Sequence, residues 1–213
     1  MTRLSRRSYS IDAPTLAQRL LGATLVRVAD NGVRLAGRIV ETEAYCGPED
    51  QAAHSYKARR TERTEPMFGV GGTSYVYFTY GMHHCMNIVA GRLDEPVAVL
   101  LRALEPTEGL EEMRTNRRPR RDGQPKPDDD LCSGPAKLCQ AMGIDRLMTG
   151  LDMTTHDRLW VEPRARAPRP DQIVTTTRVG IDNAGDWVDA PLRWYLRGSP
   201  HVSVRDPEAE RRA

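Results

Sequence analysis

The segment from Glu41 to Asn87 reads ETEAYCGPEDQAAHSYKARRTERTEPMFGVGGTSYVYFTYGMHHCMN and contains an acidic strand, a turn-rich loop, a basic loop and a tyrosine-rich strand. Side chains alternate between the two faces of a β-strand, so Glu41, Glu43 and Tyr45 should share one face. A carboxylate can activate water, aromatic rings can hold a flat ligand, and arginines can contact phosphates. The segment therefore predicts strands of one sheet that carry a reactive pocket.

Turn signals divide the chain around this segment into short strands. The Asp30-Asn31-Gly32 turn is a strong hairpin signal, and the strands after it are close enough in sequence to form an antiparallel meander. Two later stretches return to strand composition. The predicted strands are 24–28, 33–45, 73–80, 86–90, 97–104, 173–178 and 194–196.

Helices are expected in three places. Asp12 is a suitable cap for the first helix, and Gly143 is a suitable stop for the last. The predicted helices are 14–21, 105–116 and 135–142, and the predicted irregular segments are 117–130, 164–170 and a frayed tail at 206–213.

Length and composition indicate an ordinary globular domain. A chain of 213 residues buries about 70 % of its unfolded surface and needs no metal or disulfide for a core. The four cysteines form no C-x-x-C pair, and no secretory segment is evident at the start, so reduced thiols in the cytoplasm are expected. We expect one domain over 1–213, ordered from about 8 to 204, without a membrane span.

Charge alone does not identify a partner. The net charge of +2 and pI of 8.4 are lower than the values typical of nucleic-acid-binding domains. Two clusters of basic residues are more informative, although solvated loop charge is an equal alternative for the second cluster. The first is Lys57, Arg59, Arg60 and Arg63, and the second is Arg114, Arg117, Arg118, Arg120 and Arg121.

Several of these residues also have simpler interpretations than a catalytic or binding role. The two carboxylates of the acidic strand could belong to an exposed polar strand face, or to a glycosidase pair, since residues two apart on a strand are roughly 7 Å apart. His54 could simply stabilise a turn. His83, His84 and Cys85 alternate in direction and lack a fourth ligand, so no metal site is predicted.

Separate motifs in order along the chain resemble the alkyladenine (3-methyladenine) DNA glycosylase family. They are ETEAY, GPEDQAAHS, YVYFTYGMHHCMN, VLLRALEP, SGPAKLCQAMGI and RGSPHVSV, and the similarity runs from about Ser8 to Val204. The resemblance implies an α/β (α+β) fold, a single domain with a curved antiparallel sheet flanked by helices. It also implies a bacterial member of the family, associated with the nucleoid.

The resemblance also implies a set of site residues. Glu43 would be the general base, and Arg102 would help to position water and phosphate. The implied base-binding residues are Tyr45, His54, Tyr77, Asn87 and, through its backbone carbonyl, Val179. The implied DNA-binding residues are Tyr80 as the inserted wedge and Met82. The sequence itself suggests phosphate contacts for Arg59 and Arg63, which follow the acidic strand, and for Lys137 in the first turn of a helix, although Lys137 could equally be an exposed helix lysine.

The implied reaction is excision of an alkylated or deaminated purine. The enzyme would flip the base out of double-stranded DNA and hydrolyse its N-glycosidic bond without a cofactor, without strand cleavage and as a monomer. There are two alternative hypotheses. The protein could be catalytically inactive and bind damaged DNA or structured RNA, or it could be a glycosidase that acts on free nucleosides.

Overall fold

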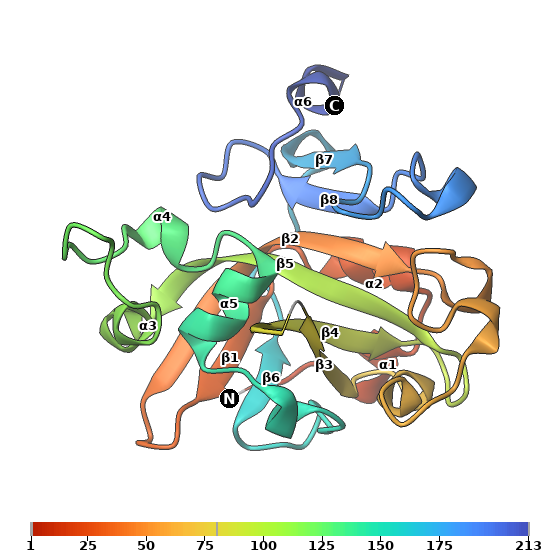
Figure 1. The fold of residues 1–213 in the computed structure, drawn as a ribbon, viewed down its shortest axis with the longest axis horizontal. Coiled ribbons are helices and arrows are strands. Elements are labelled where there is room, and N and C mark those ends of the chain that lie inside the picture. Colours follow the sequence, from red (N-terminus) through yellow and green to blue (C-terminus); the bar gives the residue numbers. More distant parts are fainter. Residues whose placement is uncertain (1, 80, 213) are drawn as a thin grey trace.

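An eight-stranded antiparallel sheet forms the centre of the molecule in a computed structural model, which describes residues 2–79 and 81–212 (Figure 1). Six strands follow the order β3-β4-β5-β2-β1-β6, and β8 pairs with both β2 and β7. The strands are β1 (Thr24–Val28), β2 (Arg34–Tyr45), β3 (Ser74–Thr79), β4 (His83–Ala90), β5 (Val97–Glu108), β6 (Leu159–Glu162), β7 (Ile173–Thr176) and β8 (Arg193–Leu196).

Six α-helices and several short 3-10 turns surround the sheet. The α-helices are α1 (Arg6–Tyr9), α2 (Ala13–Leu20), α3 (Leu110–Asn116), α4 (Asp128–Leu131), α5 (Pro135–Met142) and α6 (Pro207–Arg212). The 3-10 turns are Gly47–Glu49, Tyr56–Ala58, Glu65–Phe68, Arg146–Met148, Pro170–Gln172 and Gly185–Trp187. The predicted α+β fold with an antiparallel sheet is confirmed. None of the helices in the described ranges has the length and apolar character to cross a membrane.

Strand β2 changes its partner along its length. Its first half pairs with β1 and residues 41–43 pair with β8, while β5 lies along its other edge throughout. The register with β5 shifts on both sides of Glu41, as at a β-bulge. The irregularity lies where the pairing of β2 with β1 stops and its pairing with β8 starts, so it accompanies the change of partner and directly precedes Glu43.

The two faces of the sheet pack against different sets of residues. Val76, Ile88 and Val99 point into the main hydrophobic core, where α2 and α5 also pack. Their neighbours Tyr75 and Asn87 lie on the other face, with the smaller cluster that contains Met67 and Phe68. The alternation along the strands therefore separates a structural face from a face available for chemistry.

The first core helix is well explained by its sequence. The side chain of Asp12 accepts a hydrogen bond from the backbone N–H of Thr15 at 2.8 Å and caps α2, as predicted. Leu16 and Leu20 are buried. The hydroxyl of Thr42 donates to the carbonyl of Ala17 at 3.0 Å, which ties the helix to the structural face of β2.

The secondary structure differs from the prediction in several places, including helix α1, which was not predicted. The predicted helix 105–116 begins only at Leu110, because Glu105, Pro106 and Glu108 pair with residues 36–38 and extend β5. Gly109 then turns with φ +75°, where an added Cβ would lie 2.5 Å from the side chain of Leu35. Strand β6 was missed, α4 lies partly within the predicted loop 117–130, and residues 207–212 form α6 instead of a frayed end.

Candidate active site

Glu43 is fully buried and lies at the centre of a hydrogen-bonded arrangement. One carboxylate oxygen accepts the backbone N–H of Val179 at 2.8 Å and lies 3.1 Å from a terminal nitrogen of Arg102. The other oxygen accepts the Tyr45 hydroxyl at 3.0 Å. Glu41 is also fully buried, so the alternative of an exposed polar strand face is wrong. Both carboxylates contact Arg102, which puts them on the same side of β2, as predicted.

Arg102 is 6 % exposed and lies between the two glutamates. Burial opposes its charge, but the nearby carboxylates of Glu43 and Glu41 outweigh this effect and raise the pKa of Arg102. A cation held in this way compensates the buried negative charge beside it. The structure thus brings Arg102 to Glu43, while its contact with a phosphate stays a prediction.

A cavity of about 200 Å³ lies next to this arrangement. Its walls contain the predicted base-binding residues Tyr45, His54, Tyr77 and Asn87, and also Tyr75, which had no predicted role. The remaining residues around it are Ala52, Met67, Thr79, Ala98, Gly180 and Ile181. Tyr45 lines the cavity and bonds one oxygen of the Glu43 carboxylate. Val179 bonds the other oxygen, and its neighbour Gly180 lines the cavity, so the carboxylate is connected to the wall on two sides.

His54 is fixed in the cavity by two tyrosines. Its Nδ1 lies 2.8 Å from the hydroxyl oxygen of Tyr75, and its ring meets that of Tyr77 edge to face at a centroid distance of 4.5 Å. Burial, with smaller contributions from Arg63 and Arg59, lowers the pKa of His54 from 6.5 to about 4. The imidazole is therefore neutral near pH 7.

Asn87 is buried at the β3–β4 pair and donates from its side-chain amide to the carbonyl of Tyr75 at 3.1 Å. That bond fixes the plane of the carboxamide. The side chain therefore offers a rigid polar edge in the wall of the cavity, as its predicted position next to a purine edge requires.

A second buried ion pair holds the loop that carries Val179. Arg178 bonds Asp50 at 2.6 and 2.9 Å and the carbonyl of Ala44 at 3.0 Å. Its guanidinium carbon also lies 4.9 Å from the centre of the Tyr45 ring. Arg178 thus fixes the backbone N–H that reaches Glu43 and supports the ring that forms one wall of the cavity.

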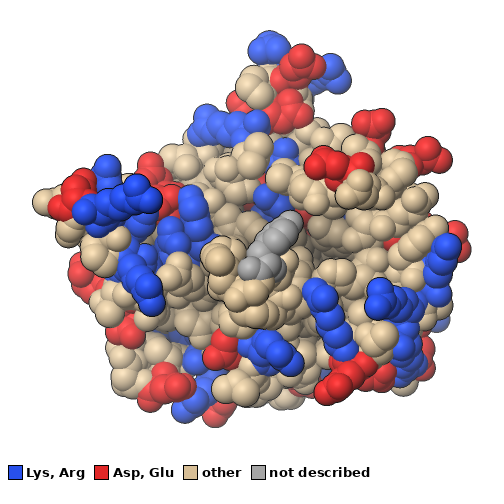
Figure 2. Space-filling view, in the orientation of Figure 1, with Lys and Arg blue, Asp and Glu red and all other residues tan. Residues whose placement is uncertain are grey.

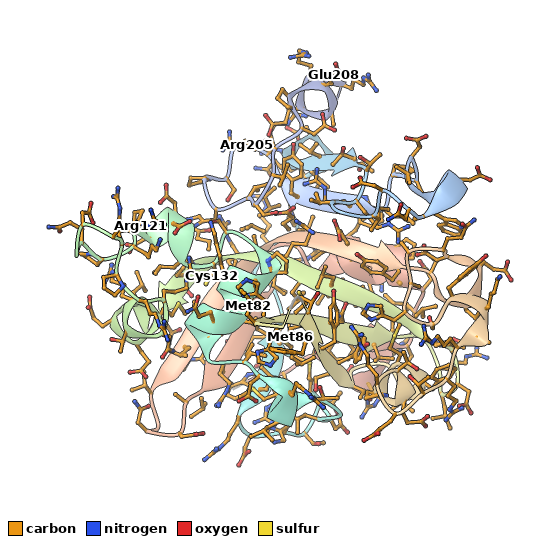
Figure 3. The ribbon with its side chains drawn as sticks, viewed as in Figure 1. Met82, Met86, Arg121, Cys132, Arg205 and Glu208 are labelled. Carbon is orange, nitrogen blue, oxygen red and sulfur yellow. The ribbon has the colours of Figure 1, made fainter. Side chains whose placement is uncertain are left out.

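Three of the predicted DNA-binding residues, Met82, Arg59 and Arg63, are exposed, and Lys137 is half-buried. Met82 is 70 % exposed and lies near the middle of the face shown in Figure 3, and Figure 2 shows lysine and arginine side chains on both sides of that area. Arg59 is exposed, and the guanidinium of Arg63 lies 5.6 Å from the centre of the Tyr77 ring. Tyr80 lies outside the described residues.

Lys137 is already paired within the molecule. Its ammonium contacts the carboxylate of Asp130 and the hydroxyl of Ser133 at 3.1 Å. A phosphate at this position would share the ammonium with Asp130, so the predicted contact requires that pair to adjust. Among the described residues, no group of three His, Cys, Asp or Glu side chains converges as metal ligands.

A buried carboxylate joined to an aromatic cavity, on an antiparallel α+β scaffold, has the features of a DNA glycosylase. The family model described as methylpurine-DNA glycosylase (MPG) matches residues 7–200. The chain belongs to this family, whose members act on alkylated purines in DNA.

The relatives include proteins from mammals and bacteria. The DNA-3-methyladenine glycosylase of Homo sapiens is 48 % identical over 213 residues, which are 99 % of this chain and 71 % of that protein. The protein of the same name from Mus musculus is 47 % identical over 98 % of this chain and 63 % of its own length. A protein of the bacterium Natranaerobius thermophilus is 42 % identical over 92 % of this chain and 96 % of its own length.

Sequence reasoning missed the residues that hold the site together, namely Tyr75, Asp50, Arg178, Arg193 and Ser203. Tyr75 had a detectable signal, since strand alternation places it on the same face as Tyr77. Of the others, Asp50 and Arg178 pair over 128 residues, and Arg193 and Ser203 contact Glu41 over 152 and 162 residues. No local pattern marks such contacts.

Proposed function

We propose that this chain is a DNA-3-methyladenine glycosylase that flips alkylated or deaminated purines out of duplex DNA and hydrolyses the N-glycosidic bond. The proposed substrates are 3-methyladenine, 7-methylguanine, hypoxanthine and ethenoadenine. The observation that carries the proposal is the buried carboxylate of Glu43, held by three donors beside an aromatic cavity. The human relative, named for 3-methyladenine, supports the lesion class.

Recognition begins with extrusion of the base, because a base inside the duplex is inaccessible. A damaged base that pairs weakly costs less to extrude than a normal one. The rings of Tyr45 and Tyr77 then hold it, and a methylated purine with positive charge gains ~0.5–2 kcal/mol from each aromatic face it covers. The cavity volume of about 200 Å³ suits one small planar group.

Neutral lesions need an additional contact, because they are poorer leaving groups. Burial raises the pKa of Tyr75, so its phenol keeps its proton, and the charge of Arg63 opposes this shift only in part. The phenol proton is then directed to Nδ1 of His54. This arrangement favours the tautomer with hydrogen on Nε2, which donates to an acceptor on the leaving purine.

The chemical step uses Glu43 as the general base. The carboxylate takes a proton from water as the water attacks the anomeric carbon and the C–N bond breaks with its electron pair on the purine. The same negative charge stabilises the positive charge that develops on the sugar. The products are a free base and an abasic site, and no covalent intermediate is formed.

We infer that the enzyme does not cleave the strand. A lyase reaction requires an amine nucleophile at the sugar. The lysines of the chain are Lys57, Lys126 and Lys137, and none of them lines the cavity in the described part of the chain. The last two are paired with Asp130.

The proposed DNA-binding face carries Met82 and the basic residues around it. Arg59 and Arg63 follow the base-binding loop directly and are placed to contact phosphates on one side of the lesion. Tyr80 is proposed as the side chain that occupies the gap in the helix. We propose that the protein acts as a monomer in the bacterial cytoplasm.

A base-release assay tests the proposal. Duplexes containing hypoxanthine, ethenoadenine or 3-methyladenine are incubated with the protein and then heated in alkali, which cleaves at abasic sites. We expect cleavage only after the alkali treatment. Tight binding without base release would support the silent binding protein, and equally efficient release from free nucleosides would support the nucleoside hydrolase.

A further inference from the structure

A second buried carboxylate, Glu41, has more hydrogen bonds than Glu43, although the reaction gives it no task. It accepts from Nε of Arg102 at 2.9 Å and from a terminal nitrogen of Arg193 at 3.0 Å. It also accepts from the backbone N–H and the hydroxyl of Ser203 at 2.6 and 2.9 Å. Glu41 is 0 %, Arg193 3 % and Arg102 6 % exposed, so water replaces none of these contacts readily.

Arg102 connects Glu41 to the catalytic carboxylate. Its Nε bonds Glu41, one terminal nitrogen lies 3.1 Å from Glu43, and the other donates to Ser203 at 3.1 Å. A guanidinium is planar and rigid, so two fixed nitrogens determine the position of the third. The contact of Arg102 with Glu43 is therefore set by Glu41 and Ser203.

Arg193 connects Glu41 to the other support of Glu43. Its Nε donates to the carbonyl of Thr177 at 2.7 Å, two residues before Val179. It also donates to the carbonyl of Val204 at 2.7 Å. Val179 supplies the backbone N–H that bonds Glu43, so the position of this donor depends on the arginine that Glu41 holds.

The formal charges of Glu41, Glu43, Arg102 and Arg193 cancel. Two glutamates face two arginines, and every member is at least nine-tenths buried. Other titratable groups that feel the charge of Glu43 are Tyr45 from β2, Tyr77 from β3, Cys85 from β4 and Arg178 from the Val179 loop. Burial raises the pKa of Tyr45, Tyr77 and Cys85, so these three are neutral near pH 7.

We propose that Glu41 is a positioning residue for the reaction, which fixes two of the three donors of Glu43, Arg102 and the N–H of Val179, and balances the charge of Arg102 and Arg193. This inference rests on the proposed role of Glu43 as general base. Removal of Glu41 leaves the catalytic carboxylate as the one remaining anion of the group. The two arginines then favour the ionised form of Glu43 and compete with water for it.

A purely structural role makes a different prediction. Loss of one member of a buried ion network destabilises a protein wherever the network lies. It does not by itself change how the rate of the folded enzyme depends on pH. The pH profile and the separation of binding from chemistry therefore distinguish the two roles.

The test compares Glu41→Gln, Glu41→Asp and a matched control, Thr42→Val. Thr42 is the next residue of β2, is fully buried and loses a hydrogen bond in the variant, but it points to α2 on the structural face. Single-turnover release of hypoxanthine from duplex DNA is measured with excess enzyme from pH 5 to 9, together with duplex binding and thermal unfolding.

We expect Glu41→Gln to bind the duplex within about threefold of wild type and to release base ~10- to 100-fold more slowly, the loss typical of a small misplacement of a catalytic group. The acidic limb of its pH profile should move to lower pH. Glu41→Asp should recover part of the rate and the original limb. Thr42→Val should keep the rate of the wild type.

The proposal would be overturned by a Glu41→Gln variant that releases base at the wild-type rate or that no longer binds the duplex. It would also be overturned if the acidic limb of the pH profile stays in place and the loss of rate is no larger than in Thr42→Val. Should Glu41→Gln not fold, Ser203→Ala decides, with a rate ~3-fold below wild type expected and an unchanged rate contradicting us. If the wild type itself releases no base, the proposed function fails. An active wild type with an equally active Glu41→Gln contradicts only the role of Glu41.

Discussion

The phenol oxygen of Tyr75 lies 2.8 Å from Nδ1 of His54, on the floor of a cavity that both residues help to form. Both groups are neutral near pH 7, because burial raises the pKa of Tyr75 and lowers that of His54 to about 4. In the proposed function the pair is a hydrogen-bond relay without net charge, which gives the cavity one oriented donor.

Replacement of Tyr75 by phenylalanine should affect neutral lesions most. The variant keeps the ring and loses the hydroxyl, so His54 is free to adopt the other tautomer. We expect excision of hypoxanthine to fall ~5- to 30-fold, which corresponds to ~1–2 kcal/mol for one lost hydrogen bond. Release of 7-methylguanine, already a good leaving group, should fall less, and single-turnover rates measure the difference. Equal losses for both bases would contradict the relay.

The stability of the protein should depend on the neutral state of His54. Its pKa is about 4 in the folded protein and near 6.5 in the unfolded chain, so only the unfolded chain takes up a proton between these values. The contribution of His54 is thus complete above about pH 6.5 and is lost as pH falls to about 4, by up to ~3 kcal/mol.

Urea unfolding of wild type and His54→Gln at pH 4.5, 5.5, 6.5 and 7.5 checks this dependence. Other acidic groups titrate in both proteins, so the difference between the two free energies of unfolding isolates His54. We expect this difference to shrink as pH falls. A difference that stays constant over the whole range would rule out a buried, neutral imidazole.

The ion pair between Arg178 and Asp50 should support both stability and activity. Both side chains have no exposed surface, so Asp50→Asn leaves a buried cation without its counter-charge and should destabilise the fold by ~3 kcal/mol or more. Arg178 also holds Val179 and Tyr45, so excision by the folded fraction should fall as well. Arg212→Gln, at the exposed pair with Glu208, is the control and should change neither quantity. Unchanged excision by folded Asp50→Asn would show that the loop needs no such anchor.

The fold was largely predictable where one residue pattern decides one element. Asp12 and the apolar spacing after it predicted α2, and the Asp30-Asn31-Gly32 turn predicted the β1–β2 hairpin. The segment 105–108 was predicted as helix from its composition, and pairing with β2 overrides that preference. Strand order, and the change of partner along β2, depend on contacts that no short window contains.

The residues of the site were likewise predictable only where they lie close together in the sequence. The residues expected to face the base are close together in sequence, and the structure gathers Tyr45, His54, Tyr77 and Asn87 around one cavity. Arg193 and Ser203, which hold Glu41, come from 152 and 162 residues further along the chain. Such partners are set by tertiary packing, so the sequence pattern around Glu43 could not reveal them.

The central claim is that Glu43 activates the water that displaces the base. Glu43→Gln keeps the size of the side chain and removes its basicity. We expect it to bind a hypoxanthine-containing duplex within about threefold of wild type.

Base release by Glu43→Gln under single-turnover conditions should fall by about 10²- to 10⁴-fold, the range for loss of a general base. Release by a properly folded, duplex-binding Glu43→Gln at a rate close to that of the wild type would contradict the account.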